Sequence, residues 1–281
     1  MAAKQVPEKY RNDERYKELL MPVDTDIRLD SVILSDENKN KIRQFIQEIQ
    51  KRELLESNGL HPMNRILMYG DSGTGKTYLS KALTNYLGYT LLYVDIGSAL
   101  NKGNVAENLT NIFKLGNELK NCVIFLDECD SIGWSREGTS RESGEVRRAT
   151  NNLFQLIDQM DKSNILIGCT NMVRMLDPAF VRRFDLKLEF FRPEGSLENA
   201  IRKFLFTDYG FTYLKDFDES LKKIVENELS VSYYEIQSVV ERAMKDALIH
   251  TGKKVVKESV IYKMLADSAD VNFDFKAIGT K

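Results

Sequence analysis

The hydrophobic positions between about residues 60 and 190 predict alternating strands and helices. Five short apolar runs predict buried strands, and the stretches between them repeat their apolar residues at helical spacing. Such alternation is typical of an α/β fold in which a parallel sheet carries helices on both faces. The predicted strands are Ile66–Tyr69, Leu91–Ile96, Cys122–Leu126, Ile165–Cys169 and Leu186–Phe190, and the predicted helices are Lys76–Leu87, Val105–Leu119 and Glu145–Met160.

The pattern changes on both sides of this region. Apolar residues recur at helical spacing from Ser35 to Ser57, which predicts one amphipathic helix that ends before Gly59 and Pro62. After Pro193 the strand pattern fades, and a small helical domain is expected. Its predicted helices are Leu197–Phe206, Leu221–Leu229, Tyr234–His250 and Ser259–Ala269.

These patterns divide the chain into four segments. A charged arm spans residues 1–30, an α/β domain spans 31–192, a small helical domain spans 193–270, and a tail spans 271–281. The arm carries alternating charges with interspersed tyrosines and leucines, so it is either a solvated tail or a docking element. The sequence leaves both interpretations open.

Composition and charge narrow the function. The chain has 281 residues, of which 42% are hydrophobic, so it can bury a core and a disordered chain is excluded. A formal net charge of −2 provides no general attraction to nucleic acids or anionic membranes, and neither is expected as a partner. The longest apolar run, Cys122–Leu126, is far too short to cross a bilayer. Three widely spaced cysteines are typical of buried thiols, and we expect a cytoplasmic location.

A glycine-rich loop follows the first predicted strand and opens a predicted helix. Its residues fit the pattern G-x-x-x-x-G-K-[ST], in which successive backbone N–H groups and the helix N-terminus converge on phosphates. Lys76 is expected to reach the β and γ oxygens of ATP, and the Thr77 hydroxyl is expected to bind Mg²⁺. The loop consists of Gly70, Asp71, Ser72, Gly73, Thr74, Gly75, Lys76 and Thr77.

Polar residues also follow the third and fourth predicted strands. Ligands of a doubly wound sheet bind at the carboxyl ends of its strands. Asp127 is therefore expected to hold Mg²⁺, and Glu128 is expected to polarise the attacking water. Asn171 places a neutral amide at the same edge, where it can bind both the water and the γ-phosphate without adding negative charge.

The loop, the acidic pair, Asn171 and the segment Leu176–Asp185 stand in the order found in AAA+ ATPases, and the sequence resembles that family from about Ser31 to Ala269. The resemblance implies a P-loop NTPase sheet followed by a small helical lid that closes over the nucleotide. It also implies a ring oligomer, expected to be a hexamer, with each ATP at a subunit boundary.

Further residue roles follow from the same resemblance. Arg182 and Arg183 are implied as arginine fingers, which reach the ATP of the neighbouring subunit and stabilise charge on the transferring phosphoryl group. The segment Val32–Leu34 occupies the place where the family holds adenine, so Ile33 is a candidate for that contact.

The chain departs from the pattern of protein-threading members. Its first loop toward a ring's centre, residues 97–104, has no aromatic residue, and Leu100 and Lys102 are the nearest substitutes for a substrate grip. Trp134 in the second such loop is another candidate for this grip, although a single tryptophan more often packs against its own domain.

Two other segments relate the chain to particular branches. Ser232–Glu235 contains no arginine where some branches carry a sensor arginine, and in this it resembles the protein-remodelling branch that includes katanin-like enzymes. Leu60–Gly70 and Ala179–Asp185 resemble small bacterial AAA ATPases encoded beside subtilisin-like proteases.

We therefore expect an ATPase that hydrolyses ATP at the subunit interfaces of a ring and uses the cycle to remodel or regulate a protein partner. An alternative is a nucleotide-switched scaffold that assembles on ATP and recruits an effector such as a protease or nuclease, with slow hydrolysis as a reset. The missing aromatic in residues 97–104 favours the scaffold, whereas Asp127 and Glu128 favour hydrolysis.

Overall fold

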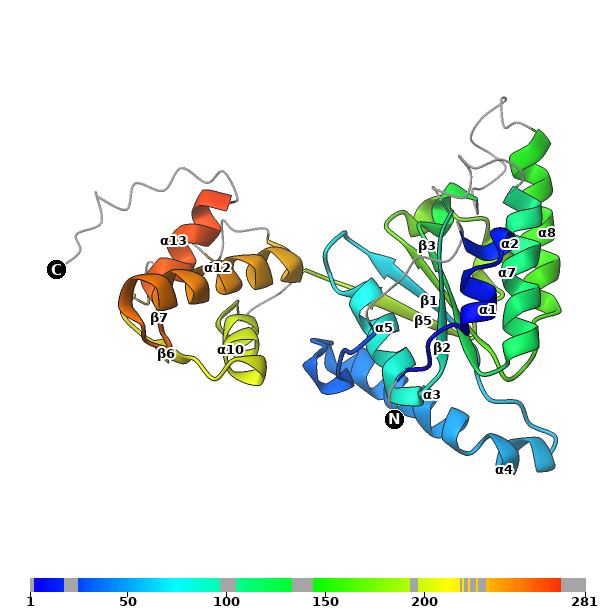
Figure 1. Ribbon diagram of the computed structural model, residues 1–281, viewed down its shortest axis with the longest axis horizontal. Coiled ribbons are helices and arrows are strands. Elements are labelled where there is room, and N and C mark those ends of the chain that lie inside the picture. Colours follow the sequence, from blue (N-terminus) through cyan, green and yellow to red (C-terminus); the bar gives the residue numbers. More distant parts are fainter. Residues whose placement is uncertain are drawn as a thin grey trace. The chain divides into compact units, whose positions relative to one another are not determined.

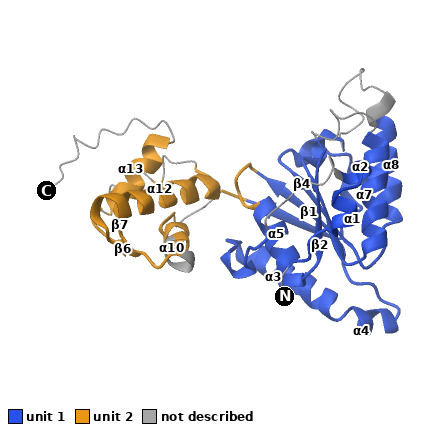
Figure 2. Ribbon diagram, in the orientation of Figure 1, with its two compact units in different colours: residues 1–70, 76–190 blue, residues 71–75, 191–281 orange. Residues whose placement is uncertain are grey.

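In the computed structural model the chain forms two compact units. The first contains residues 1–70 and 76–190, and the second contains residues 71–75 and 191–281 (Figure 2). The described residues are 3–17, 25–96, 105–132, 144–192, 197–217, 219, 222, 226 and 231–268.

A five-stranded parallel sheet with the order β2-β3-β4-β1-β5 forms the centre of the first unit (Figure 1). The sheet interior explains the continuous apolar runs, because β4 is buried at every position while β2 and β5 at the edges alternate between buried and more exposed residues. All five predicted strands are present within one residue of their expected bounds. The strands are β1 (Arg65–Gly70), β2 (Thr90–Asp95), β3 (Cys122–Asp127), β4 (Ile165–Thr170) and β5 (Leu186–Phe190).

Helices cover both faces of this sheet (Figure 1). On one face, α3 (Asp36–Gln50) and α5 (Lys76–Leu87) pack their apolar sides in one core cluster. On the other face, α7 (Val105–Leu119) and α8 (Gly144–Asp158) belong to a second cluster. The α/β architecture with helices on both faces is therefore confirmed, and α5 and α7 have the predicted bounds.

The single helix predicted over Ser35–Ser57 is wrong. The backbone leaves the helical conformation at Lys51, so that α3 is followed by a separate short helix, α4 (Arg52–Ser57). No residue of α4 is buried, and the Leu54 side chain is 61% exposed. The core contacts that hold α3 therefore stop at Ile49, and helical spacing alone does not keep the two segments in one line.

The N-terminal arm docks on the first unit over the residues that are described. The short helices α1 (Glu8–Arg11) and α2 (Glu14–Lys17) bury Tyr10 and Tyr16, and α2 packs on α7. The Tyr10 hydroxyl donates to Glu118, and the Lys4 amide donates to the Tyr89 carbonyl at 3.0 Å beside the edge strand β2. Residues 3–17 thus pack on the first unit through these buried tyrosines and hydrogen bonds.

The second unit is mainly helical. Its helices are α10 (Leu197–Asp208), α12 (Tyr233–Thr251) and α13 (Glu258–Ser268), and most of the helix predicted at Leu221–Leu229 lies outside the described residues. A parallel pair, β6 (Thr212–Leu214) and β7 (Val255–Lys257), was not predicted because a three-residue strand is too short to show a period. Within the described ranges, no helix has the length and apolar character needed to cross a membrane.

Further short 3₁₀ or α-helical turns lie among the described residues of the first unit. They place several candidate residues at strand ends, because two of them directly follow β3 and β4. The turns are η1 (Leu29–Ser31), η2 (Cys129–Ser131), η3 (Val173–Met175) and α9 (Pro178–Val181).

Candidate active site

The carboxyl ends of β1, β3 and β4 meet at one edge of the sheet because the three strands are parallel. Lys76 and Thr77 begin α5 just after β1, Asp127 ends β3, and Asn171 follows β4. The structure therefore places these four candidate residues at the same edge of the sheet.

Gly70 and Lys76 show how the loop leaves β1 and enters α5. Gly70 has φ +133°, and a Cβ atom at this position would lie 2.0 Å from the Phe190 carbonyl oxygen, so no side chain fits. The buried Lys76 side chain returns to the start of the loop, where its Nζ donates to the Gly70 carbonyl at 2.7 Å. Its ammonium group thus lies at the strand end, where phosphate oxygens are expected.

Residues 71–75 of the same loop are grouped with the second unit. Gly73 has φ +72°, and a Cβ atom there would lie 2.7 Å from the Ser232 hydroxyl oxygen. The Tyr234 amide donates to the Gly73 carbonyl at 3.2 Å. Thr74 is buried and its hydroxyl donates to the Asp71 carbonyl at 2.7 Å. The start of α12, which lacks a sensor arginine, therefore contacts the loop through Ser232 and a backbone amide.

Other polar contacts of this part of the loop are at its surface. Asp71 and Ser72 are exposed, and Gly75 adopts φ +102°. The Arg192 guanidinium lies 3.0 Å from the Asp71 carboxylate. Glycines and a short-range hydrogen bond thus shape this part of the loop backbone.

Asp127 has a partner on each carboxylate oxygen. The Tyr93 hydroxyl on β2 donates to Oδ2 at 2.5 Å, and the backbone amide of Glu128 donates to Oδ1 at 3.1 Å. Burial of the phenol and its hydrogen bond to the Asp127 carboxylate raise the pKa of Tyr93. Asp127 is thus a carboxylate held in one orientation by uncharged donors.

Glu128 turns the chain out of β3 in the left-handed region, at φ 52° and ψ 43°. This backbone conformation is unfavourable for a residue with a side chain, and such strain is concentrated at functional sites. The side chain is exposed, and its pKa is raised by partial desolvation and by the negative charges of Asp95, Asp127 and Asp130. A carboxylate with a raised pKa is a stronger base, as water activation requires.

The end of β4 carries a threonine that the sequence reasoning did not single out. The buried Thr170 hydroxyl donates to Asp130 Oδ1 at 2.6 Å and accepts from the Met172 amide at 2.8 Å. These bonds fix the turn that presents the exposed Asn171. Tyr93 and Asp95 were also missed. The signal was their alternation with Leu92 and Val94, which places both polar residues on one face of a strand that is otherwise apolar.

Arg182 and Arg183 differ sharply in their surroundings. The Arg183 guanidinium binds the Asp158 carboxylate at 3.0 and 3.1 Å, donates to the Ala179 carbonyl at 2.9 Å, and lies 4.4 Å from the centre of the Phe154 ring. Arg182 is exposed. Arg183 is therefore engaged within its own chain, whereas Arg182 is exposed.

Of the remaining candidates, the structure describes Ile33. Ile33 is half-buried directly after the buried Val32, and the neighbouring Ser31 and Tyr78 hydroxyls lie 2.9 Å apart. Leu100, Lys102 and Trp134, the candidates for a substrate grip, lie outside the described residues.

The donor set fits a nucleotide with Mg²⁺. This ion is usually held by one or two protein oxygens together with substrate phosphates, and the Thr77 hydroxyl and the Asp127 carboxylate are donors of that kind. No cluster of three or more His, Cys, Asp or Glu side chains that could hold a metal by itself occurs in the described part of the chain. The residues therefore suit an ion that arrives with its nucleotide.

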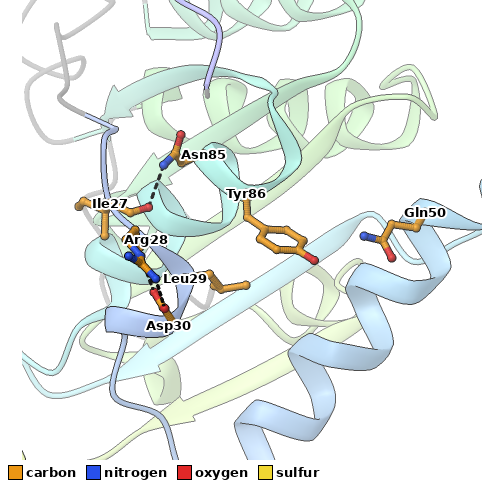
Figure 3. A pocket seen from close by; sticks show the side chains of 7 residues that line it. All are labelled: Ile27, Arg28, Leu29, Asp30, Gln50, Asn85 and Tyr86. Carbon is orange, nitrogen blue, oxygen red and sulfur yellow. Dashed lines mark hydrogen bonds and ion pairs between the residues drawn. The ribbon is translucent and has the colours of Figure 1, made fainter. Parts of the chain in front are cut away.

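A separate hollow of about 730 Å³ lies on the first unit (Figure 3). The Asn85 amide donates to the Ile27 carbonyl at 3.1 Å at its wall, and the ring of Tyr86 borders it on the side of Gln50. None of the candidate active-site residues lines it. Its lining consists of Ile27, Arg28, Leu29, Asp30, Gln50, Asn85 and Tyr86.

Comparisons with known proteins agree with this geometry. A family model described as "ATPase family associated with various cellular activities (AAA)" matches residues 66–192. An uncharacterized AAA family ATPase of Sinorhizobium fredii is 30% identical over 85% of this chain and 70% of its own length. A 26S proteasome regulatory subunit 4 homolog of Dictyostelium discoideum is 29% identical over 78% of this chain and 52% of its own length. A proteasome-activating nucleotidase of Methanocaldococcus jannaschii is 35% identical over 65% of this chain and 45% of its own length. The chain thus spans about half the length of these two proteasome-type relatives.

Proposed function

The chain belongs to the AAA family of ATPases, and from this premise we propose how its residues bind and hydrolyse ATP. Backbone amides of residues 70–77 and the Lys76 ammonium bind the phosphates, and Thr77 and Asp127 provide the oxygens for Mg²⁺. When bound, Mg²⁺ neutralises charge on the phosphate oxygens. Glu128 accepts a proton from the attacking water, Asn171 orients that water, and Ile33 contacts adenine.

The observation that carries this proposal is the arrangement of Asp127 and Glu128. Two adjacent carboxylates have different surroundings: Asp127 is held at both oxygens, whereas Glu128 is exposed on a strained turn and its pKa is raised. This difference supports separate roles, with one carboxylate as a fixed metal ligand and the other as a base.

We propose that a ring, with six subunits expected, completes the site and that Arg182 is the finger supplied by the neighbouring subunit. Its exposure supports this role, because a side chain that serves another subunit must extend from its own. Arg183 would first have to leave Asp158 and the Phe154 ring, so the structure favours Arg182 over Arg183.

Complementation between two inactive variants tests both the base and the finger. We expect Arg182→Ala to lower phosphate release by about 10³-fold and Glu128→Gln by about 10²-fold or more. Mixed rings then contain sites with an intact Glu128 on one subunit and an intact Arg182 on its neighbour, and activity returns on mixing. Arg43→Ala, at an exposed position on α3, is the control and leaves turnover unchanged.

The two outcomes of mixing are distinct. If the mixture stays as inactive as its components while sedimentation shows that mixed oligomers form, the finger does not act between subunits. If Glu128→Gln retains turnover within a few-fold of the unmodified protein, Glu128 is not the base.

We propose a protein as the partner, because the relatives include proteins named as proteasome regulatory subunits and a proteasome-activating nucleotidase. A subtilisin-like protease is the specific candidate from the sequence resemblance, and the cytoplasm is the proposed location. The Glu128→Gln variant with ATP is expected to hold the assembled state, so co-purification with this variant, compared with a Lys76→Ala control that cannot bind ATP, identifies the partner.

A nucleotide-switched scaffold remains the second candidate because residues 97–104 contain no aromatic residue. Substitution of both Leu100 and Lys102 by alanine distinguishes the two functions. A remodelling enzyme is expected to lose partner processing and keep ATP hydrolysis, whereas a scaffold keeps both.

A further inference from the structure

Tyr93 lies in the carboxyl-terminal half of the edge strand β2. In the register of the sheet, Tyr93 lies opposite Phe125 and Asp95 lies opposite Asp127. Because side chains alternate between the two faces of a strand, Leu92, Val94 and Ile96 all belong to one core cluster. Tyr93 is on the other face of the strand, where it packs with the cluster that contains Phe125 and the apolar side of α5.

Two contacts hold the Tyr93 side chain at this place. Its ring packs against Phe125 with the ring centres 5.0 Å apart and a tilt of 39°. Its hydroxyl donates to Asp127 Oδ2 at 2.5 Å. The ring is thus fixed by packing on β3, and the hydroxyl is fixed on the residue that ends the same strand.

We propose that Tyr93 is a positioning residue that orients Asp127 as a ligand for the Mg²⁺ of the bound nucleotide. This inference rests on the proposed function, since it assumes that Asp127 is a metal ligand. Together with the Glu128 amide on Oδ1, the phenol leaves the carboxylate one orientation. A carboxylate that is already oriented loses less conformational freedom when it binds a cation.

The chemistry of the donor matters as much as its position. A lysine or arginine at position 93 would hold Asp127 equally well, but it would neutralise the charge that attracts a cation. The phenol is an uncharged donor, and so is Thr170, which binds the nearby Asp130 at 2.6 Å. The carboxylates at this edge are therefore held in place while they keep their negative charge.

The test measures metal binding without turnover. Mn²⁺, an oxygen-preferring ion visible by electron paramagnetic resonance, replaces Mg²⁺ as the probe, and its affinity for the protein–ADP complex is measured for four proteins. These are the unmodified chain, Tyr93→Phe, Asp127→Asn and the double variant. We expect Tyr93→Phe to weaken Mn²⁺ binding by about 10-fold, and ADP binding in EDTA to stay unchanged.

Tyr89→Phe is the matched control. Tyr89 directly precedes β2 and is also partly buried in the cluster with Phe125. It lies at the amino end of β2, whereas Asp127 is paired with the carboxyl end of β2. Loss of its hydroxyl removes the same atom from the same kind of residue, and we expect Mn²⁺ affinity to stay within about two-fold of the unmodified protein.

The double variant separates positioning from a general structural effect. If Tyr93 acts through Asp127, Tyr93→Phe adds nothing to the loss already caused by Asp127→Asn. An equal further loss in that background overturns the inference. If Tyr93→Phe binds Mn²⁺ as tightly as the unmodified chain while Asp127→Asn does not, the inference fails and the proposed function stands. If Asp127→Asn itself binds Mn²⁺ normally, the proposed metal ligand is wrong as well.

Discussion

Two groups of carboxylates in this molecule have opposite kinds of partner. At the edge of the sheet in the first unit, Asp127 and Asp130 accept from uncharged hydroxyls. In the second unit, Glu198 and Glu258 both bind the buried ammonium group of Lys222, at 3.0 Å from Oε1 in the case of Glu258. We call the first the strand-end cluster (Asp95, Asp127, Glu128 and Asp130) and the second the lysine cluster (Glu198, Glu258, Lys222 and Tyr213).

The difference appears directly in the pKa values of one glutamate from each cluster. Desolvation and three neighbouring carboxylates raise the pKa of Glu128, whereas hydrogen bonds from Lys222, with Arg202 and Lys215, lower the pKa of Glu198 to about 2. In the strand-end cluster, the hydrogen bonds described for Asp127 and Asp130 come from uncharged groups, so these carboxylates keep a negative charge that suits a cation arriving with a ligand. The carboxylates of the lysine cluster are paired with Lys222 and, at Glu198, also with Arg202 and Lys215, which suits a structural role.

Removal of the central cation should produce the largest change in stability. Lys222→Met leaves Glu258, whose side chain is 1% exposed, as a buried carboxylate without the Lys222 cation, while the Tyr213 hydroxyl still donates to Oε1 at 2.8 Å. We expect the free energy of unfolding of the second unit to fall by about 3–5 kcal/mol, measured by urea denaturation followed by circular dichroism.

Lys215→Met is the matched control for this substitution. Its ammonium group also binds Glu198, at 3.1 Å, but the side chain is 53% exposed. An exposed ion pair contributes only about 0–1 kcal/mol, so this variant is expected to remain close to the unmodified protein. Equal losses for the two lysines would show that burial does not determine the strength of the cluster.

The pH dependence of stability should show the next largest effect. Because the pKa of Glu198 in the folded state, about 2, is below its usual value of 4.5, its stabilising contribution is complete above pH 4.5. The contribution is lost as the pH falls from 4.5 toward 2. Glu198→Gln is expected to be less stable at pH 7 by about 2 kcal/mol and to approach the unmodified protein near pH 2 in acid titrations of Tm. A constant difference over this range would contradict the assignment.

How far the sequence predicted these features depends on the distance over which each signal acts. The helices Lys76–Leu87 and Val105–Leu119 could be predicted to the residue, because their apolar periods are strong and local. The places of the loop 70–77 and of Asp127 and Glu128 at strand ends could be predicted, because each motif directly follows a strongly apolar run. The role of Tyr93 could not be predicted, because its partner Asp127 is 34 residues away. The sequence of neither strand shows that β2 and β3 are neighbours in the sheet.

The same reason explains what was missed elsewhere. Burial of Tyr10 depends on α7 and on Glu118, 108 residues away, so the sequence alone could not decide whether the arm packs on the rest of the chain. The lysine cluster joins Lys222 to Glu258 across 36 residues. The difference between Arg182 and Arg183 also depends on a distant group, Asp158 on α8. In each case the residue types were visible, and only the fold decides which of them meet.

The smallest expected effect is the change in stability caused by Glu128→Gln. It contrasts the two clusters most sharply, because its sign is opposite to that expected for Glu198→Gln. The raised pKa of Glu128 means that the folded state disfavours the charged form, so the carboxylate costs stability above its pKa. Glu128→Gln removes that charge and is expected to raise Tm at pH 7, by on the order of 1 °C because the side chain is exposed. The gain should disappear at pH 4, where the carboxyl is protonated in the folded state. Glu53→Gln, an exposed glutamate on α4, serves as the control in calorimetry without nucleotide. A lower Tm for Glu128→Gln at pH 7 would mean that Glu128, like Glu198, is stabilised by its surroundings, and the contrast between the two clusters would be lost.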